Sequence, residues 1–474
     1  MSSVVFLGCL LAKRSWVITG MVFGAAVASP ITTFTRGGAG AIYASDLVSL
    51  TLLLCLFVPG SRRLFSSVAP KWYRRFLVLM LLALISVVVV APLMTGDLAT
   101  TEYGQRVRIQ DVGVPLPLLI AGFRVGRIFL FVAYFVFAAR LIMDHAMVRW
   151  ATKMVAGAVL VLACGQIISF LGMAELSLYV PGWRHAHGHL FGHPKAAIGR
   201  IYIVGVFVAL LLMYRSYASP AYLALLGGTV AAMFFSGSRA AVVGVAAGVC
   251  ILGLSTRLGG KVVVTALICV GAFGGVFLAA LAPERAESFA TALYRPGESS
   301  RWEVWGWVMT HLFTHPYLLV SGVGFSNFQY ALATAETFVA EHAHNDLLTC
   351  VTELGLIGLG LFVAFLMHLG LAIFRRIRRT TGRLRWEALC VAAAFGGLAV
   401  SGLFEHTFYF SSSGMPVQRL FAVFFGVHTA WWVQQAYQRS VELEFARTVA
   451  STAPADSSAT APVLTAGSAE GTTE

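Results

Sequence analysis

The clearest scarcity in this 474-residue sequence is that of charge. Only 12% of the residues are charged, whereas 58% are hydrophobic, and a soluble globular protein carries about 25% charged residues. A chain this poor in charge cannot cover itself with a water-compatible surface. Apolar runs of about 20 residues, each long enough to cross a bilayer, recur along it. The sequence therefore predicts a polytopic membrane protein and excludes a water-soluble enzyme, a secreted disulfide scaffold and a single-anchor receptor.

Two further shortages restrict the chemistry. The seven cysteines fall in apolar segments and form no CxxC pair, so neither a disulfide framework nor a zinc ribbon is indicated. The six aspartates include no DxD pair, which weakens the case for a metal-dependent transferase that uses nucleotide sugars.

The apolar runs predict an all-α bundle of about twelve membrane spans, which makes up a transmembrane domain over residues 1–449. The tail 450–474 is rich in Ser, Thr, Ala, Pro and Gly and is expected to be a disordered cytoplasmic end. The predicted spans are 15–34, 42–59, 76–94, 114–139, 151–173, 196–214, 220–236, 240–255, 262–282, 346–374, 386–405 and 417–437.

The net charge of +13 raises the possibility of nucleic acid binding, and the positions of the charges argue against it. The basic residues concentrate in alternate loops, between spans 2 and 3 and between spans 10 and 11. By the positive-inside rule these loops are cytoplasmic, and so are both termini. The basic surplus therefore orients the protein in a membrane, and no nucleic-acid partner is expected. The residues concerned are Arg62, Arg63, Lys71, Arg74, Arg75, Arg375, Arg376, Arg378, Arg379, Arg383 and Arg385.

The longest loop on the opposite, external side is expected at 283–345, between spans 9 and 10. It is rich in aromatic residues and glycine, so we expect it to be partly helical and functional. Within it, the segment from Arg295 to Arg301 precedes Trp302, Trp305 and Trp307 in an apolar helical pattern. This pattern predicts a helix in the membrane interface, with an ordinary aromatic belt as the simpler alternative.

Two histidines, His342 and His344, lie where this loop enters span 10. A histidine at the mouth of a span can exchange a proton near neutral pH, and an acid such as Asp346 or Glu341 would orient its ring. Capping and packing is the simpler reading of this segment.

Several more basic residues are expected on the external side. Arg239 follows Ser236-Gly-Ser at a tight corner between spans 7 and 8, where a snorkelling anchor is the alternative. Lys195 and Arg200 follow the segment 184–193, whose four histidines favour a basic rim for an anionic ligand over a metal site. Those histidines are His185, His187, His189 and His193.

Arg124 and Arg127 share one face of span 4. Arginines inside a bilayer usually face a bundle interior or a water-filled cavity. They indicate a path for an anionic group, or a structural pair with an acid such as Asp46.

Arginines and histidines near a membrane surface suit a diphosphate on a lipid carrier. Guanidinium groups bind phosphate oxygens bidentately, and one histidine can act as the base on an acceptor hydroxyl. Because arginines would neutralise the leaving diphosphate, neither a metal nor a cofactor is required.

The same residues resemble the O-antigen ligase/polymerase family. The similarity lies in Ser236-Gly-Ser-Arg239, in Ser300-Arg301-Trp302-Glu-Val-Trp305 with His315-Pro316 and Gly322-Val-Gly324, and in His344-Asn345-x9-Gly355-x2-Gly358. The last pattern is similar to the His-Asn/Ser/Gln-x9-Gly-x2-Gly motif of the ligases.

The resemblance implies a metal-independent glycosyltransferase with twelve spans in the bacterial inner membrane. It would move a glycan, at the periplasmic face, from undecaprenyl diphosphate to an acceptor hydroxyl. The motif favours a ligase, whose acceptor is lipid A-core, over a polymerase, whose acceptor is a second lipid-linked glycan. A transporter or flippase and a non-catalytic scaffold are the alternatives from other classes.

The resemblance also implies roles for individual residues. His344 would be the base, with His342 as a competitor, and Arg239 and Arg301 would bind the diphosphate. Arg200 is a looser match. The remaining candidates for substrate binding are Lys195, Arg295, Arg124 and Arg127.

Overall fold

The structure is a computed structural model, and it divides the chain into two units, Met1–Trp431 and Trp432–Glu474, which are described separately. The residues that it describes are 14–26, 30–33, 41–43, 134–142, 144–170, 195–215, 219–255, 300–325, 343–405, 407–408 and 415–452, with isolated positions between 47 and 126 and at 328.

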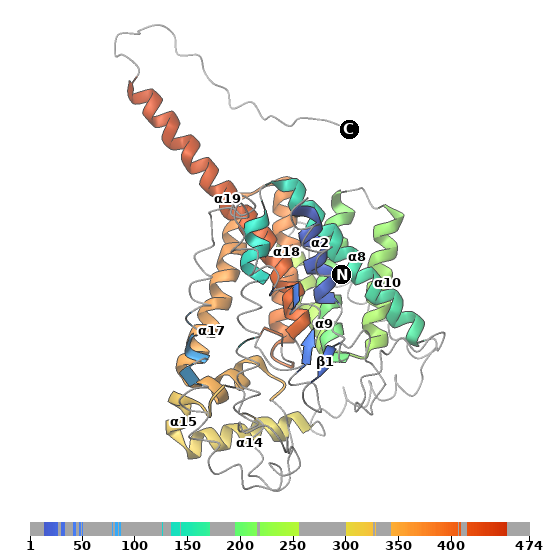
Figure 1. Cartoon of the computed structure of the whole chain (residues 1–474), viewed down its shortest axis with the longest axis vertical. Helices are drawn as coiled ribbons and strands as arrows, with labels where there is room; N and C mark the ends of the chain where they lie inside the picture. Colours follow the sequence, from blue (N-terminus) through green and yellow to red (C-terminus); the bar gives the residue numbers. More distant parts are fainter. Residues whose placement is uncertain are drawn as a thin grey trace. The chain divides into compact units, whose positions relative to one another are not determined.

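The described part of the chain is helical apart from one short antiparallel strand pair (Figure 1). The elements are α2 (Arg14–Ala26), β1 (Pro30–Thr33), β2 (Ala41–Tyr43), α8 (His145–Phe170), α9 (Lys195–Arg215), α10 (Pro220–Ser236), α11 (Arg239–Ser255), α14 (Ser300–Thr314), α15 (Pro316–Ser321), α17 (Asp346–Arg379), α18 (Gly382–Ser401) and α19 (Met415–Thr452).

Four of these helices are long and apolar enough to cross a membrane, which agrees with a multi-pass membrane protein. They cover His145–Ile168, Ala197–Tyr214, Asp346–Arg379 and Gly382–Ser401, and the shorter apolar helices include Pro220–Ser236 and Arg239–Ser255. The total of twelve spans and the side on which each loop lies remain predictions.

Several of the predicted span boundaries differ from the helices. The first predicted span, 15–34, is wrong at its end, because α2 stops at Ala26 and Pro30 begins a strand; the residue before a proline is disfavoured in a helix. Helix α8 begins at His145 rather than 151, where the Asp144 carboxylate accepts a hydrogen bond from the Met147 N–H at 2.8 Å. Helix α18 ends at Ser401 rather than 405.

Small residues bring α11 and α18 into close antiparallel contact. A Cβ atom added to Gly244 would lie 2.7 Å from the Gly397 carbonyl oxygen, and one added to Gly248 would lie 2.6 Å from that of Ala393. Small residues four apart let helix backbones approach closely within a membrane. The register places the first residue of α11, Arg239, at the same end of the bundle as the last turn of α18.

Helix α9 joins the same contact. Its Ile203 lies against both Gly244 and Gly397, and a Cβ on Gly199 would overlap Ser238 in the corner before α11. The beginnings of α9 and α11 therefore lie together, and Arg200, one residue after Gly199, lies at this end of the bundle.

Helix α17 is broken at Gly355, which has φ 67° and ψ −172°. The break exposes two carbonyl groups to the segment after α15: Val323 N–H donates to the Thr352 carbonyl at 2.8 Å, and Gly324 N–H donates to that of Glu353 at 3.0 Å. A Cβ on Gly355 would overlap the Val320 carbonyl oxygen. Glycine at 355 thus allows the chain to turn and α15 to lie directly on the break.

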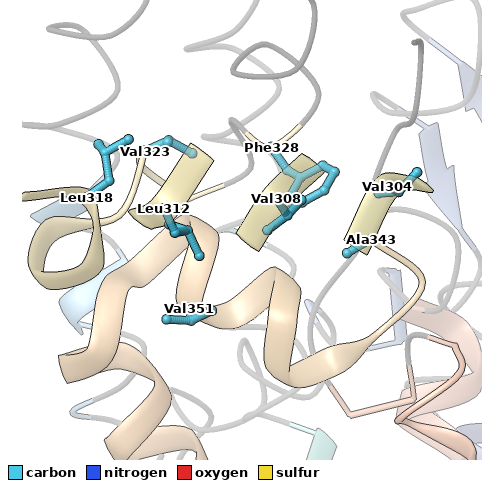
Figure 2. Packing of buried hydrophobic residues seen from close by; sticks show 8 residues of the cluster. All are labelled: Val304, Val308, Leu312, Leu318, Val323, Phe328, Ala343 and Val351. Carbon is cyan, nitrogen blue, oxygen red and sulfur yellow. The ribbon is translucent and has the colours of Figure 1, made fainter. Parts of the chain in front are cut away.

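The helices α14 and α15 attach to α17 through an apolar cluster (Figure 2). The α14 side chains Val304, Val308 and Leu312 recur every four residues and so share one helix face. They are buried with Leu318 of α15 and Val351 of α17, and the remaining members are Val323, Phe328 and Ala343. This packing fixes the position of Arg301, in the first turn of α14, relative to the beginning of α17.

The described part of the second unit is the helical stretch 432–452, in which residues 436–449 are all exposed. The predicted tail 450–474 begins within the last turn of this helix, and residues 453–474 lie outside the described part of the chain.

Candidate active site

A buried carboxylate, Glu405, collects two of the predicted site residues. Its Oε2 atom lies 3.1 Å from Nδ1 of His344, and its Oε1 atom accepts a hydrogen bond from Nη2 of Arg301. Nη1 of Arg301 also donates to the Phe404 carbonyl at 2.7 Å. The side chain of Glu405 is only 9% exposed, whereas that of His344 is 38% exposed. The histidine therefore has a ring edge open to a substrate and a buried acid behind it.

The backbone holds His344 in a strained conformation. His344 is the described non-glycine residue with a positive φ, 50°, and a non-glycine residue in this region usually persists only where its surroundings fix it. On one side Trp305 Nε1–H donates to the Ala343 carbonyl at 2.6 Å. On the other side the Asn345 carboxamide oxygen accepts from the N–H groups of Leu347 and Leu348, which caps α17.

Asp346 ties the beginning of α17 to the chain after α18. Its carboxylate accepts hydrogen bonds from the N–H groups of Thr407, at 3.0 Å, and Phe408, at 2.8 Å. Its own N–H donates to the Gly402 carbonyl at 2.8 Å, and Asn345 Nδ2 donates to that of Leu403 at 3.0 Å. These bonds flank Glu405 on both sides and so hold its carboxylate next to His344.

Arg200 adds a second positive charge near Glu405. Only 2% of the residue is exposed, and its guanidinium group interacts electrostatically with the carboxylates of Glu405 and Asp346. A buried charge is stable only with partners of opposite charge. Arg200, Arg301 and His344 therefore surround Glu405 with positive or potentially positive groups, and these four residues are called the Glu405 cluster below.

The surroundings of Glu405 keep its carboxyl group ionised. Burial alone would raise its pKa, but the hydrogen bond from His344 and the positive charges of His344, Arg301 and Arg200 outweigh burial and lower the pKa to about 2. An ionised Glu405 accepts the Nδ1–H of His344. In the neutral form of the ring with Nδ1 protonated, Nε2 carries the lone pair that accepts a proton.

Arg239 occupies a different position from the Glu405 cluster residues. It is exposed and begins α11 directly after the corner at Gly237, which has φ 63°. Within the described ranges it forms no ion pair. Because it has no carboxylate partner among the described residues, Arg239 is available to an anionic ligand at this end of the bundle.

The other predicted residues are placed only in part. The backbone of Lys195 begins α9. Arg124, Arg127, Arg295 and His342 lie outside the described residues, as do the histidines between 185 and 193. The described residues contain no group of three or more His, Cys, Asp or Glu that could hold a metal, and independence from a metal remains a prediction.

The residue that the sequence analysis missed is Glu405. It was included in the predicted span 386–405, and Asp346 or Glu341 was expected to orient the histidine ring. The structure places Glu405 four residues beyond the end of α18, and the Asp346 carboxylate binds backbone N–H groups instead. An acid at the end of a predicted span was the available signal for it.

A second buried carboxylate, Glu387, lies near the beginning of α18, toward the other end of that helix. Its Oε1 atom lies 3.0 Å from Nδ1 of His428 in α19, and its Oε2 atom lies 3.3 Å from Nε2 of His145 in α8. Glu387 and His428 are each 1% exposed. This trio joins three helices and lies apart from the Glu405 cluster, so we assign it to stability.

The comparison with protein families supports the resemblance seen in the sequence. Residues 222–363 match the family model described as O-antigen ligase, a stretch that holds Arg239, Arg301, His344 and Gly355. Over this stretch the chain is similar to the O-antigen ligase family, whose members are glycosyltransferase-like membrane enzymes that act on lipid-linked glycans. No curated protein matches the chain.

Proposed function

We propose that this protein is an O-antigen ligase-like glycosyltransferase of the bacterial inner membrane. It transfers a glycan from undecaprenyl diphosphate to a hydroxyl group of lipid A-core at the periplasmic face. The observation that carries the proposal is the contact of the His344 ring with Glu405, beside Arg301 and Arg200. This arrangement joins a base to cationic groups suited to a diphosphate.

In the proposed reaction, Nε2 of His344 accepts the proton of the acceptor hydroxyl. The acceptor oxygen then forms a bond to the anomeric carbon of the glycan, and the bond between that carbon and the diphosphate oxygen breaks. Glu405 keeps Nδ1 protonated and stabilises the imidazolium that forms. Undecaprenyl diphosphate leaves with the bonding electron pair, so no oxidant, reductant or metal enters the balance.

The arginines stabilise the charge that develops on the leaving diphosphate. The guanidinium group of Arg301 donates hydrogen bonds to both Glu405 and the Phe404 carbonyl, which fix its orientation. Arg239 has no ion pair within the described ranges, and we assign it to direct contact with the phosphate oxygens. Positioned cations of this kind act most strongly where charge develops in the transition state.

Helix beginnings add to the same field. The helices α9, α11, α14 and α17 each start at this end of the bundle, as the contacts of Gly199, Arg301 and Gly402 show. A helix N-terminus carries a partial positive charge and unpaired N–H groups. The arrangement therefore favours an anionic substrate over a neutral one.

The alternative within the family is a polymerase, whose acceptor is the terminal sugar of a second lipid-linked glycan. A strain that lacks the gene distinguishes the two. Loss of a ligase leaves lipid A-core bare while polymer accumulates on its carrier, whereas loss of a polymerase leaves core with a single repeat unit. A gel of the lipopolysaccharide reads out both patterns.

The same strain, complemented with Glu405→Gln, tests the assignment of the site. We expect the gel pattern of the deletion, together with normal amounts of protein in the membrane. Glu303→Gln is the matched control, because Glu303 is exposed in the first turn of α14, two residues after Arg301. Normal lipopolysaccharide in the Glu405→Gln strain would contradict the proposed mechanism and favour a scaffold.

A further inference from the structure

Helix α14 has an exposed apolar stripe in addition to its buried apolar face. One face carries Val304, Val308 and Leu312 and is buried against the cluster in Figure 2. The other carries Trp302, Met309 and Phe313, which are all exposed, Phe313 to 67%. At 100° per residue these three side chains lie within one narrow stripe, about 120° around the helix from the centre of the buried face. A helix in water would carry polar residues there.

The exposed stripe continues beyond α14. Tyr317 and Val320 of α15 and Leu356 and Ile357 of α17 are also exposed. The carbonyl oxygen of Val320 lies against Gly355, so α15 and the residues after the break in α17 are neighbours. The exposed apolar residues of α15 therefore adjoin those of α17, and both follow the stripe on α14.

The part of this apolar surface that lies on α17 indicates that lipid covers the surface on α14 and α15. Asp346–Arg379 is one of the helices apolar enough to cross a membrane, and most of its apolar surface is not buried by the protein. Its exposed Leu356 and Ile357 therefore face lipid. In Figure 1, α14 lies crosswise to the long helices α9 and α18, which is the orientation of a helix in the plane of a membrane surface.

The polar residues of α14 fit the same orientation. Glu303, Thr310 and Thr314 lie along one flank between the two apolar faces and are exposed. On the same flank, nearer the buried face, the ring of Trp307 stacks on that of His311, with 4.9 Å between their centroids. Tryptophan and amphipathic aromatic groups concentrate at the boundary between acyl chains and headgroups.

We propose that α14 and α15 form a lipid-docking surface, whose stripe of Trp302, Met309, Phe313, Tyr317 and Val320 rests among the lipids of the leaflet next to the Glu405 cluster. The docked helix holds Arg301, at its first turn, at the depth of lipid phosphate groups. This surface is distinct from the proposed catalytic chemistry and would operate whichever glycan is transferred.

Photo-crosslinking in the membrane tests this surface directly. Phe313 is replaced by benzoylphenylalanine in the full-length protein, the protein is irradiated in native membranes, and the purified product is weighed by intact mass spectrometry. We expect an added phospholipid mass. The matched control is the same replacement at Thr310, on the polar flank of the same helix, which should give at least about fivefold less lipid adduct.

Each outcome decides for or against the proposal. Equal lipid adducts at both positions would overturn it, and so would the absence of an adduct at Phe313. An adduct with a protein in place of lipid would also overturn it and would indicate a protein partner. If the Phe313 variant is not recovered as a single species by gel filtration, the same replacement at Met309, in the same stripe, is used for the test. Because adduct formation needs no transfer activity, this result is independent of the proposed function.

Discussion

The glycine at position 355 offers a sharp test of how α17 positions the site. We expect Gly355→Ala to destabilise the protein and to abolish transfer, although alanine is ordinarily the better residue in a helix. The backbone of Gly355 has φ 67° and ψ −172°, a region that is essentially restricted to glycine and costs other residues about 1–3 kcal/mol.

The new methyl group would also meet backbone atoms that cannot rotate away. Besides overlapping the Val320 carbonyl oxygen, it would lie 2.5 Å from the Val320 carbonyl carbon and 3.0 Å from Ser321 N. Relieving these contacts moves α15 and weakens the hydrogen bonds of Val323 and Gly324, which contribute about 1 kcal/mol each. The combined cost is about 3–5 kcal/mol.

The assay is the thermal unfolding of the purified protein in detergent, read together with transfer activity. The size scaling of unfolding entropy gives roughly 1–2 °C per kcal/mol for a chain of this length, so we expect the melting temperature to fall by about 5 °C. Gly360→Ala is the matched control in the same helix, because a Cβ there would meet no atom within 4 Å. It should leave the melting temperature unchanged or raise it. Equal melting temperatures for the two variants would refute this explanation of the motif glycine.

Three further predictions concern charged groups. Arg239→Ala should leave the melting temperature unchanged, because the side chain forms no ion pair within the described ranges. The same substitution should weaken donor binding about tenfold or more, as expected for a lost charged hydrogen bond. An unchanged KM for the donor would contradict the role of Arg239 in donor binding. The stabilisation that Glu405 gains from its pKa of about 2, against 4.5 ordinarily, is present above pH 4.5 and is lost as the pH falls toward 2. It amounts to about 3 kcal/mol, so the wild-type melting temperature should fall over this window more steeply than that of Glu405→Gln, and parallel curves would contradict the assignment. Glu387→Ala should cost about 3–5 kcal/mol of stability, because it leaves His428 buried beside an empty site; an unchanged melting temperature would show that the trio is not structural.

Local patterns in the sequence predicted the helices well where the structure of a segment depends on that segment alone. The predicted ranges 220–236 and 240–255 agree with the helices α10 and α11 to within a residue, and whether these shorter helices cross the membrane stays a prediction. The motif from His344 to Gly358 was also found, through its resemblance to the motif of the ligases. Its physical meaning was not, since the conformation of Gly355 is set by the contact with α15.

The central contact of the site is the part that the sequence did not reveal. Glu405 and His344 are 61 residues apart, and their approach depends on α18 ending at Ser401 and on the hydrogen bonds of Asp346 to Thr407 and Phe408. A difference of four residues in the end of a helix decides whether an acid lies inside a span or beside a catalytic base. Periodicity does not determine helix ends with that accuracy.

The most direct test of the account is a transfer assay with purified protein, undecaprenyl-diphosphate-linked glycan and lipid A-core. We predict that His344→Ala lowers the rate by about 10²- to 10⁴-fold, the range that a positioned general base contributes, while the protein still folds, with a lower melting temperature because Glu405 loses the His344 hydrogen bond. His368→Ala, further along the same helix, should retain full activity. A His344→Ala variant as active as the wild-type protein would contradict the assignment of His344 as the base.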